Sequence, residues 1–210
     1  MLTRSPNSPL RLGLLLSGRG SNFLAIAESI RAGRLPGVEI AVVLSNIAEA
    51  PGLAAARDLG IPTDTCISKG RPRAEHDADM IACLQSHQVD LVCLAGYMRL
   101  LSPTFIAAFR NRILNIHPSL LPAFPGLEAQ EQAFAYGVKI AGCTVHFVDE
   151  ELDHGPIVVQ RAIPVLDTDT PESLNHRILA EEHLAYTDAL RLVSSGACEI
   201  RGRRYVKRDS

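Results

Sequence analysis

The stretch RLGLLLSGRGSN, residues 11–22, holds a short apolar run, two glycines and the start of a segment with helical spacing. The apolar run predicts a buried strand over 11–17, and the spacing of apolar residues over 22–32 predicts a helix. A glycine turn that joins a strand to a helix is a basic unit of α/β folds. The fold class therefore depends on whether this unit is repeated along the chain.

The same alternation of strand and helix continues through the first half of the chain. Strands are expected at 40–45, 62–66 and 89–96, and helices at 51–59 and 74–87. The strands are continuously apolar, which is typical of strands that are buried on both faces. We therefore expect an α/β protein with a Rossmann-like, open and mostly parallel sheet that has helices on both faces.

The second half of the chain has a different spacing of elements. Strands are expected at 112–116, 144–148 and 157–163, and only the short polar loop DEELDHGP separates the last two. A loop of that length is too short for a helical crossover, so we expect an antiparallel excursion of the sheet. A helix over 171–193 with Thr170 as its N-cap and a strand pair around Gly202 complete the prediction of one domain, residues 1–210.

Composition narrows the classes of function. The chain has 210 residues, 47% of them hydrophobic, a formal net charge of −2 and a pI of about 6.4, so no overall basic field favours nucleic acid as a partner. No apolar stretch is long enough for a membrane span, and the start MLTRSPNSPL lacks the apolar core of a signal peptide, so we expect a cytoplasmic protein with a small-molecule substrate. We interpret the five cysteines as core residues, and no HExxH or similar pattern predicts a metal: Cys66, Cys83, Cys93, Cys143 and Cys198.

The glycine turn SGRGSN, residues 17–22, is the first candidate site. Phe23 stands where the third glycine of GxGxxG would be, which disfavours a nicotinamide-dependent oxidoreductase, and no GK[ST] follows. A glycine turn at a helix N-terminus, with Ser21 and Asn22 at its mouth, is suited to bind one phosphate group. The alternative is an ordinary tight turn between a strand and a helix.

A second candidate site lies in LNIHPSLLPAFPG, residues 114–126. If the strand is extended, Asn115 and His117 share a face, and an amide donor beside an imidazole suits the oxyanion of a carbonyl addition. Asp153 in LDHGP is the best placed carboxylate, ahead of Asp149, Glu150 and Glu151, because glycine and proline shape its loop. A buried histidine at a strand end and an aspartate in a turn remain the structural alternative.

These motifs together carry a resemblance to a known family. SGRGSN, YMRLL (97–101), LNIHPSLLPAFPG, GCTVHFVDEELDHGPIVVQ and EEH (181–183) occur in this order between residues 12 and 192. The chain resembles the phosphoribosylglycinamide formyltransferase family, folate-dependent enzymes of de novo purine synthesis. The resemblance implies transfer of the formyl group of 10-formyltetrahydrofolate, the co-substrate, to the amine of glycinamide ribonucleotide.

The resemblance also implies roles for individual residues. Asn115, His117 and Asp153 would be catalytic, with Asp153 orienting the histidine and assisting proton transfer. The nucleotide substrate would be bound by Gly20, Ser21, Asn22 and Glu182. The folate would be bound by Arg73, Met98, Arg99, Leu100, Leu101, Asn115, Val148 and Asp149, with the loop 148–153 closing over the pteridine.

Some features depart from the family pattern, and some rival functions stay open. We expect Arg19 to face solvent. Glu128 stands where many relatives carry His or Asp, and His154 is a rival acid or base beside Asp153. The nearest rival is 10-formyltetrahydrofolate hydrolase, which would be expected to carry an N-terminal regulatory domain. Methionyl-tRNA formyltransferase would be expected to carry a C-terminal RNA-binding domain, and a noncatalytic binding module fits the three polar residues poorly. A monomer and a homodimer are both compatible with the sequence.

Overall fold

A computed structural model describes residues 8–208, so most of the amino-terminal stretch considered for a signal peptide lies outside the described residues. Contacts within the chain divide it into two compact units, one ending at Leu114 and the other beginning at Asn115. The two units are described separately below, and the single domain predicted over 1–210 stays a prediction.

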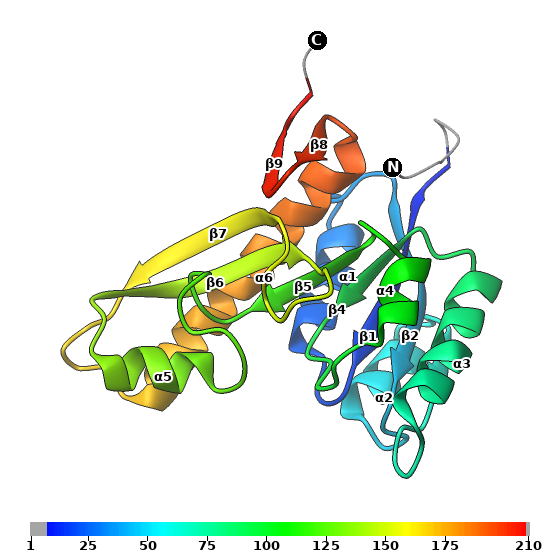
Figure 1. The fold of residues 1–210 in the computed structure, drawn as a ribbon, viewed down its shortest axis with the longest axis horizontal. Coiled ribbons are helices and arrows are strands. Elements are labelled where there is room, and N and C mark those ends of the chain that lie inside the picture. The colour runs from blue at the N-terminus through cyan, green and yellow to red at the C-terminus, as the bar shows by residue number, and fades with distance from the viewer. Residues whose placement is uncertain (1–7, 209–210) are drawn as a thin grey trace. The chain divides into compact units, whose positions relative to one another are not determined.

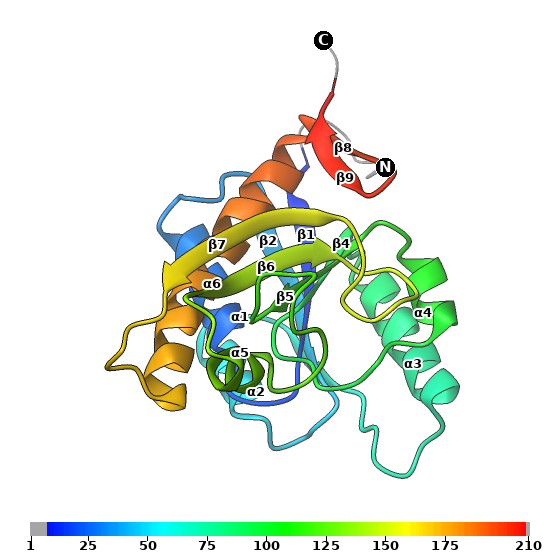
Figure 2. The ribbon, with the colours of Figure 1, turned by 60° about the vertical axis from the view of Figure 1, so that its left-hand side comes forward.

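The first unit alternates strands and helices as the sequence predicts (Figure 1). Its elements are β1 (Leu10–Leu16), α1 (Ser21–Arg31), β2 (Val38–Ser45), α2 (Pro51–Asp58), β3 (Thr63–Thr65), α3 (Arg73–Ser86), β4 (Leu91–Leu94) and α4 (Pro103–Ala108). Strand β1 pairs in parallel with β2 and β4, and β2 pairs in parallel with β3. Helices α1 and α2 lie on one side of these strands and α3 and α4 on the other (Figure 2).

The core of the first unit explains this arrangement. Every leucine of β1 is fully buried, which requires cover on both faces of the strand. Phe23 and Ile26 of α1 are also fully buried, as is Leu84 of α3. Each such side chain contributes about 1.5–3 kcal/mol through removal of apolar surface from water. The carboxyl ends of β1, β2 and β4 thereby hold the loops that follow them in fixed positions.

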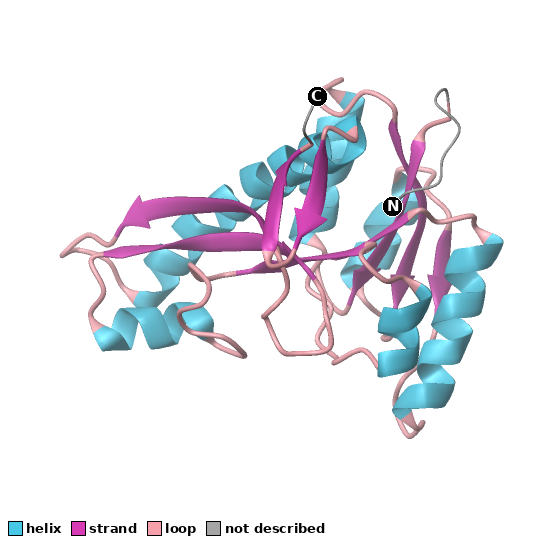
Figure 3. Ribbon diagram, turned by 45° about the horizontal axis from the view of Figure 1, so that its top comes forward, coloured by secondary structure: helices cyan, strands magenta, loops and turns pink. Residues whose placement is uncertain are grey.

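The second unit contains antiparallel strand pairs and one long helix (Figure 3). Its elements are β5 (Ile113–His117), which begins before the boundary, α5 (Ala129–Tyr136), β6 (Ile140–Phe147), β7 (Ile157–Pro164), α6 (Pro171–Ser195), β8 (Cys198–Arg201) and β9 (Arg204–Lys207). Strands β6 and β7 are antiparallel, as are β8 and β9, and the strand order over residues 8–208 is β3-β2-β1-β4-β5-β6-β7-β9-β8. The predicted fold class, a mostly parallel sheet with an antiparallel C-terminal part, is confirmed.

Helix α6 packs one apolar face against β6 and β7. Leu174, Ile178, Ala185 and Ala189 recur at the spacing of one helix face, and all four are fully buried. Strand β7 alternates between half-buried and exposed residues over much of its length, which fits a strand with one solvated face.

Two helices were not predicted from the sequence. Helix α4 has six residues, too few for a periodic pattern, and Ser102 caps it by accepting a hydrogen bond from the Phe105 amide. Helix α5 buries only Ala129 and Ala133, so its apolar face is too small to give a clear periodic signal. Glu128 is the N-cap residue of α5.

The cysteines follow the predicted pattern in part. Cys66, Cys93 and Cys143 are buried, whereas Cys83 and Cys198 are half-buried. Burial raises the pKa of Cys66 to about 11 and that of Cys143 to about 12, which keeps both thiols protonated at neutral pH. These thiols therefore behave as small hydrophobic side chains.

The start of α6 provides a test of the predicted cap. The Thr170 hydroxyl accepts a hydrogen bond from the Ser173 amide at 3.2 Å, and the Ser173 hydroxyl accepts one from the Thr170 amide at 2.9 Å. We expect Thr170→Ala to lower the free energy of unfolding by about 1 kcal/mol, measured by urea denaturation, because one end of this capping box is lost. Thr168→Ala, two residues earlier at an exposed position, should change it by less than about 0.5 kcal/mol. Equal effects of the two substitutions would contradict the assigned cap.

Candidate active site

Strand β5 presents Asn115 and His117 on one face, as the alternation of side chains in a strand requires. His117 is 4% exposed, and Asn115 is half-buried. The His117 Nε2 atom lies 2.8 Å from the carbonyl oxygen of Phe124. A carbonyl oxygen only accepts hydrogen bonds, so Nε2 donates and the other ring nitrogen, Nδ1, is turned toward a different partner.

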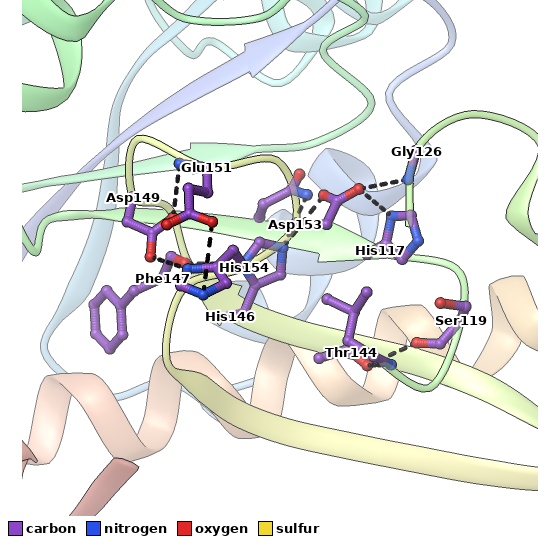
Figure 4. Close-up of polar contacts among 12 residues, drawn as sticks. His117, Ser119, Gly126, Thr144, His146, Phe147, Asp149, Glu151, Asp153 and His154 are labelled. Atoms are coloured by element: carbon purple, nitrogen blue, oxygen red, sulfur yellow. Dashed lines mark hydrogen bonds and ion pairs between the residues drawn. The ribbon is translucent and has the colours of Figure 1, made fainter. Parts of the chain in front are cut away.

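That partner is Asp153, whose Oδ2 atom lies 3.4 Å from His117 Nδ1 (Figure 4). The Gly126 amide donates to the same oxygen at 2.8 Å. Asp153 itself has a φ of 50°, a left-handed conformation that turns the chain just before the glycine and proline of LDHGP. The predicted grouping of Asn115, His117 and Asp153 at one place therefore occurs within the second unit.

A second histidine also faces Asp153, and the sequence did not single it out. His146 is 2% exposed, and its Nε2 atom lies 3.7 Å from Asp153 Oδ1 and 3.3 Å from Asn115 Nδ2. Its Nδ1 atom donates to the Phe147 carbonyl oxygen at 2.8 Å. The available signal was the alternation of Thr144 and His146 in β6, which places two polar side chains on one face of an otherwise apolar strand.

The pKa of Asp153 is held below its ordinary value of 3.8. Burial acts to raise this pKa, but hydrogen bonds from His146 and the Gly126 amide and the charges of His117 and His146 together outweigh it. The carboxylate is therefore ionised at neutral pH inside a buried cluster. An ionised carboxylate in contact with two imidazoles can accept or orient a proton.

The loop between β5 and α5 is fixed by hydrogen bonds to β6. The Thr144 hydroxyl donates to the Ser119 carbonyl at 2.6 Å and accepts from the Leu121 amide at 3.0 Å, and Gln160 donates to both Thr144 and the Leu121 carbonyl. The Ser119 hydroxyl in turn donates to the Ala123 carbonyl at 2.6 Å. The proline-rich segment is therefore held in place, and it ends at the Gly126 amide, which donates to Asp153.

The loop after β6 carries Val148 and Asp149, both half-buried. Asp149 lies 2.9 Å from His154 Nδ1 and accepts from the Glu151 amide at 3.1 Å. His154 also contacts the Arg203 guanidinium, which donates to the His154 carbonyl at 2.7 Å. His154 is thus engaged with Asp149 and Arg203, and His117 and His146 are the rings that contact Asp153.

The glycine turn is placed in the first unit as predicted. Gly20 has a φ of 71° and precedes α1, and a Cβ atom there would lie 2.9 Å from Leu16 Cδ2 and 3.4 Å from the Gly52 Cα. The first hydrogen bond within the helix runs from the Leu24 amide to the Gly20 carbonyl. The glycine turn thus opens onto the N-terminus of α1, a position at which backbone amides commonly bind anions. Ser21 begins the helix, Asn22 is buried and Arg19 is exposed.

The segment 97–101 follows β4, also in the first unit. Met98 is 70% exposed and Leu100 is 56% exposed, which is unusual for large apolar side chains, while Arg99 and Leu101 are half-buried. Arg73 is the first residue of α3 and is exposed. In the second unit, Glu182 lies on α6 and is 6% exposed. Predicted binding residues thus occur in both units.

Two general features of the described part of the chain bear on the class of protein. No helix within residues 8–208 is long and apolar enough to cross a membrane. In the same residues, no group of three or more His, Cys, Asp or Glu side chains is placed to hold a metal ion.

Comparison with known proteins gives consistent matches. A model of the family described as formyl transferase matches residues 10–190. The chain is 46% identical over 190 residues to the trifunctional purine biosynthetic protein adenosine-3 of Drosophila pseudoobscura pseudoobscura. This match covers 89% of this chain but only 14% of the length of that protein. The chain is also 40% identical over 178 residues to phosphoribosylglycinamide formyltransferase of Escherichia coli (strain K12), and this match covers 84% of this chain and 84% of that protein.

A solved structure matches over nearly the whole chain. The crystal structure of glycinamide ribonucleotide transformylase 1 from Symbiobacterium toebii superposes with a TM-score of 0.92 and 53% sequence identity, covering 96% of this chain and 95% of that one. The fold described above is therefore the fold of that protein.

The ionised state of Asp153 can be tested through the pH dependence of stability. We expect Asp153→Asn to lower the free energy of unfolding by about 1.5–3 kcal/mol at neutral pH, because hydrogen bonds to a charged group are lost. The folded-state pKa is lowered, so this stabilisation is present above 3.8 and is lost as the pH falls through the folded-state pKa. Urea denaturation of both proteins over this range should show the difference shrinking in acid.

Asp167→Asn is the matched control for this experiment. Asp167 is exposed and lies 3.6 Å from Lys139 in a solvent-screened pair, so its replacement should leave stability nearly unchanged at every pH. Equal stability of Asp153→Asn and wild type at neutral pH would contradict the assigned charge of Asp153.

Proposed function

Because this chain belongs to the formyl transferase family, we propose that it transfers the formyl group of 10-formyltetrahydrofolate to the primary amine of glycinamide ribonucleotide. The products are formylglycinamide ribonucleotide and tetrahydrofolate, and the reaction belongs to de novo purine synthesis. Likeness to relatives that carry the name phosphoribosylglycinamide formyltransferase supports this choice of substrates. The observation on which the proposal rests is the buried cluster of Asp153, His117, His146 and Asn115.

The reaction requires hydrogen-bond donors that stabilise a developing negative charge. When the amine attacks the formyl carbon, the carbonyl oxygen becomes an oxyanion, and fixed donors nearby stabilise it. Asn115 supplies an amide and His117 an imidazole on the same face of β5. The amide of Asn115 is oriented by His146 through one N–H, and its second N–H can bind the oxyanion. The ring of His117 is held between Phe124 and Asp153, so it has to turn from the Phe124 carbonyl before it donates to the oxyanion.

The reaction also requires a proton to leave the attacking amine and reach the departing N10 of the folate. Asp153 is ionised at neutral pH and contacts His117, so it is suited to orient that ring and to receive a proton directly or through water. The collapse of the tetrahedral intermediate then breaks the bond between the formyl carbon and N10. In this scheme Asn115, His117 and Asp153 are the catalytic residues.

Binding of the two substrates is assigned to the surrounding loops. The amides of the glycine turn and the N-terminus of α1 suit the phosphate of the ribonucleotide, and the exposed apolar side chains of segment 97–101 suit a flat folate ring. The proposed ribonucleotide contacts are Gly20, Ser21, Asn22 and Glu182. The proposed folate contacts are Arg73, Met98, Arg99, Leu100, Leu101, Asn115, Val148 and Asp149.

The same proposal includes the location of the protein in the cell, its oligomeric state and its partners. Both proposed substrates are small and water-soluble, and we place the protein in the cytoplasm, as a monomer or homodimer without a nucleic-acid or membrane partner. The formal net charge of −2 supports this assignment, because it provides no general attraction for nucleic acid.

A direct assay separates the proposed transferase from the rival hydrolase. Purified protein is mixed with 10-formyltetrahydrofolate, with and without glycinamide ribonucleotide, and loss of the formyl group is followed spectrophotometrically. We expect deformylation that depends on the ribonucleotide, with one formylated ribonucleotide formed for each folate consumed. Deformylation at the same rate without the ribonucleotide would indicate 10-formyltetrahydrofolate hydrolase, and no reaction in either mixture would contradict both enzymes.

The role of His117 is tested by substitution. We expect His117→Ala to lower kcat by about two to four orders of magnitude, the usual contribution of a general acid or base, with the Kd for tetrahydrofolate changing little. His176→Ala, at an exposed position on α6, should leave both values unchanged. A His117→Ala enzyme with normal kcat and weakened folate binding would reject the catalytic assignment.

A further inference from the structure

Ser17 connects the glycine turn to the segment 97–101, and we propose that it is a positioning residue that couples the binding of the two substrates. The inference rests on the proposed function, because it concerns the loops assigned there to the phosphate and to the folate ring. It adds a residue outside those assigned sites, one that would touch neither substrate.

Ser17 makes two hydrogen bonds to the chain that follows β4. Its amide donates to the Gly96 carbonyl at 3.0 Å, and its hydroxyl oxygen accepts from the Met98 amide at 3.0 Å. Gly96 has a φ of 79°, which turns the chain so that the Met98 amide points back toward Ser17. One residue at the start of the glycine turn thus fixes the backbone on both sides of Tyr97.

The Ser17 hydroxyl is itself oriented by a buried polar network. It donates to Asn46 Oδ1 at 2.6 Å, and Asn46 Nδ2 donates to the Ser68 hydroxyl at 3.1 Å. Ser17, Asn46 and Ser68 are 9%, 8% and 7% exposed. Because the hydroxyl proton is directed to Asn46, the oxygen is left to accept from Met98. In a buried setting such a network holds its members in one arrangement.

The glycine turn is also held on the side away from Met98. The Gly18 carbonyl accepts from the Gly52 amide at 3.0 Å, at the start of α2, and a Cβ atom on Gly52 would lie 3.1 Å from that carbonyl oxygen. The turn therefore has little freedom to move without Ser17 moving. A shift of residues 18–22 on ligand binding is therefore passed through Ser17 to Met98, and a shift at Met98 is passed to the turn.

Coupling of this kind is reciprocal. If the ribonucleotide tightens folate binding by some factor, the folate must tighten ribonucleotide binding by the same factor. The Ser17 hydroxyl is the group whose removal should reduce that factor, because it is the side-chain contact between the two loops. Removal of the Ser17 hydroxyl also takes away a hydrogen-bond partner of the Met98 amide and of the Asn46 side-chain oxygen Oδ1, in a buried part of the protein.

The test compares Ser17→Ala with Ser45→Ala by steady-state kinetics and calorimetry. Ser45 is a matched control: it ends the neighbouring strand β2, is 1% exposed, and its hydroxyl accepts from the Ile47 amide at 3.0 Å. That bond lies within one loop and does not reach segment 97–101. Both variants lose one buried hydroxyl that accepts from a backbone amide, and Ser17→Ala also loses the bond to Asn46, so its loss of stability should be at least as large as that of Ser45→Ala.

We expect Ser17→Ala to raise KM for both substrates by about fivefold, the effect of losing one hydrogen bond, while kcat changes by less than about threefold. The Kd for tetrahydrofolate, measured with and without glycinamide ribonucleotide, should differ in wild type and in Ser45→Ala. In Ser17→Ala that difference should shrink toward none.

Two results would overturn the inference. One is a Ser17→Ala protein that loses stability as Ser45→Ala does but keeps the wild-type KM values and the wild-type difference in Kd. The other is an increase in KM for one substrate alone. If Ser17→Ala does not fold, Asn46→Ala serves in its place, because it removes the acceptor that orients the Ser17 hydroxyl.

Failure of the proposed function gives a different result from failure of this inference. If wild type shows no deformylation that depends on the ribonucleotide, the substrates are wrong, and the inference falls with them. If wild type transfers the formyl group and Ser17→Ala behaves as Ser45→Ala does, the proposed function stands and the coupling through Ser17 is rejected.

Discussion

The charge of the Asp153 carboxylate is the constraint on which the second unit depends. A carboxylate that is largely removed from water needs groups around it that favour its charge: Asp153 accepts a hydrogen bond from the Gly126 amide and lies 3.4 Å from His117 Nδ1 and 3.7 Å from His146 Nε2. The Gly126 amide can lie there only if the loop after β5 ends at that point. The hydrogen bonds of Thr144 and Ser119 inside that loop, and the left-handed turn at Asp153, follow from the same requirement.

The two histidines beside Asp153 are held in the same way. Each ring uses one nitrogen to donate to a backbone carbonyl, that of Phe124 for His117 and that of Phe147 for His146, and turns its other nitrogen toward the carboxylate. The backbone thereby fixes which nitrogen faces Asp153. The rings differ in one respect, since only His146 is bonded to the Asn115 amide. The positions of these nitrogen atoms and of the carboxylate are thereby fixed, which suits the acid and base roles proposed for them.

Much of the fold and part of the site could be predicted from the sequence. Continuous apolar strands such as β1 and β4 are covered on both faces, so their pattern is strong, and the pairing of Asn115 with His117 follows from strand alternation alone. Helices α4 and α5 were missed because one is short and the other buries only two alanines. His146 was missed because its role comes from β6 lying beside β5, and contacts between strands distant in sequence leave no local pattern. The pairing of Asp149 with His154 depends on a loop conformation, which composition does not determine.

The segment after β4 combines a fixed backbone with a free side chain. The Met98 amide is bonded to a buried hydroxyl, yet its side chain is 70% exposed, and Leu100 beyond it is 56% exposed. Methionine is unbranched and polarizable, so it adapts to the outline of whatever lies against it, whereas the backbone groups beside it stay where the strand holds them. A surface built in this way is selective for the positions of a ligand's polar atoms and tolerant of the shape of its rings. For the folate site proposed at this segment, altered pterins that keep their hydrogen-bonding edge should therefore still bind.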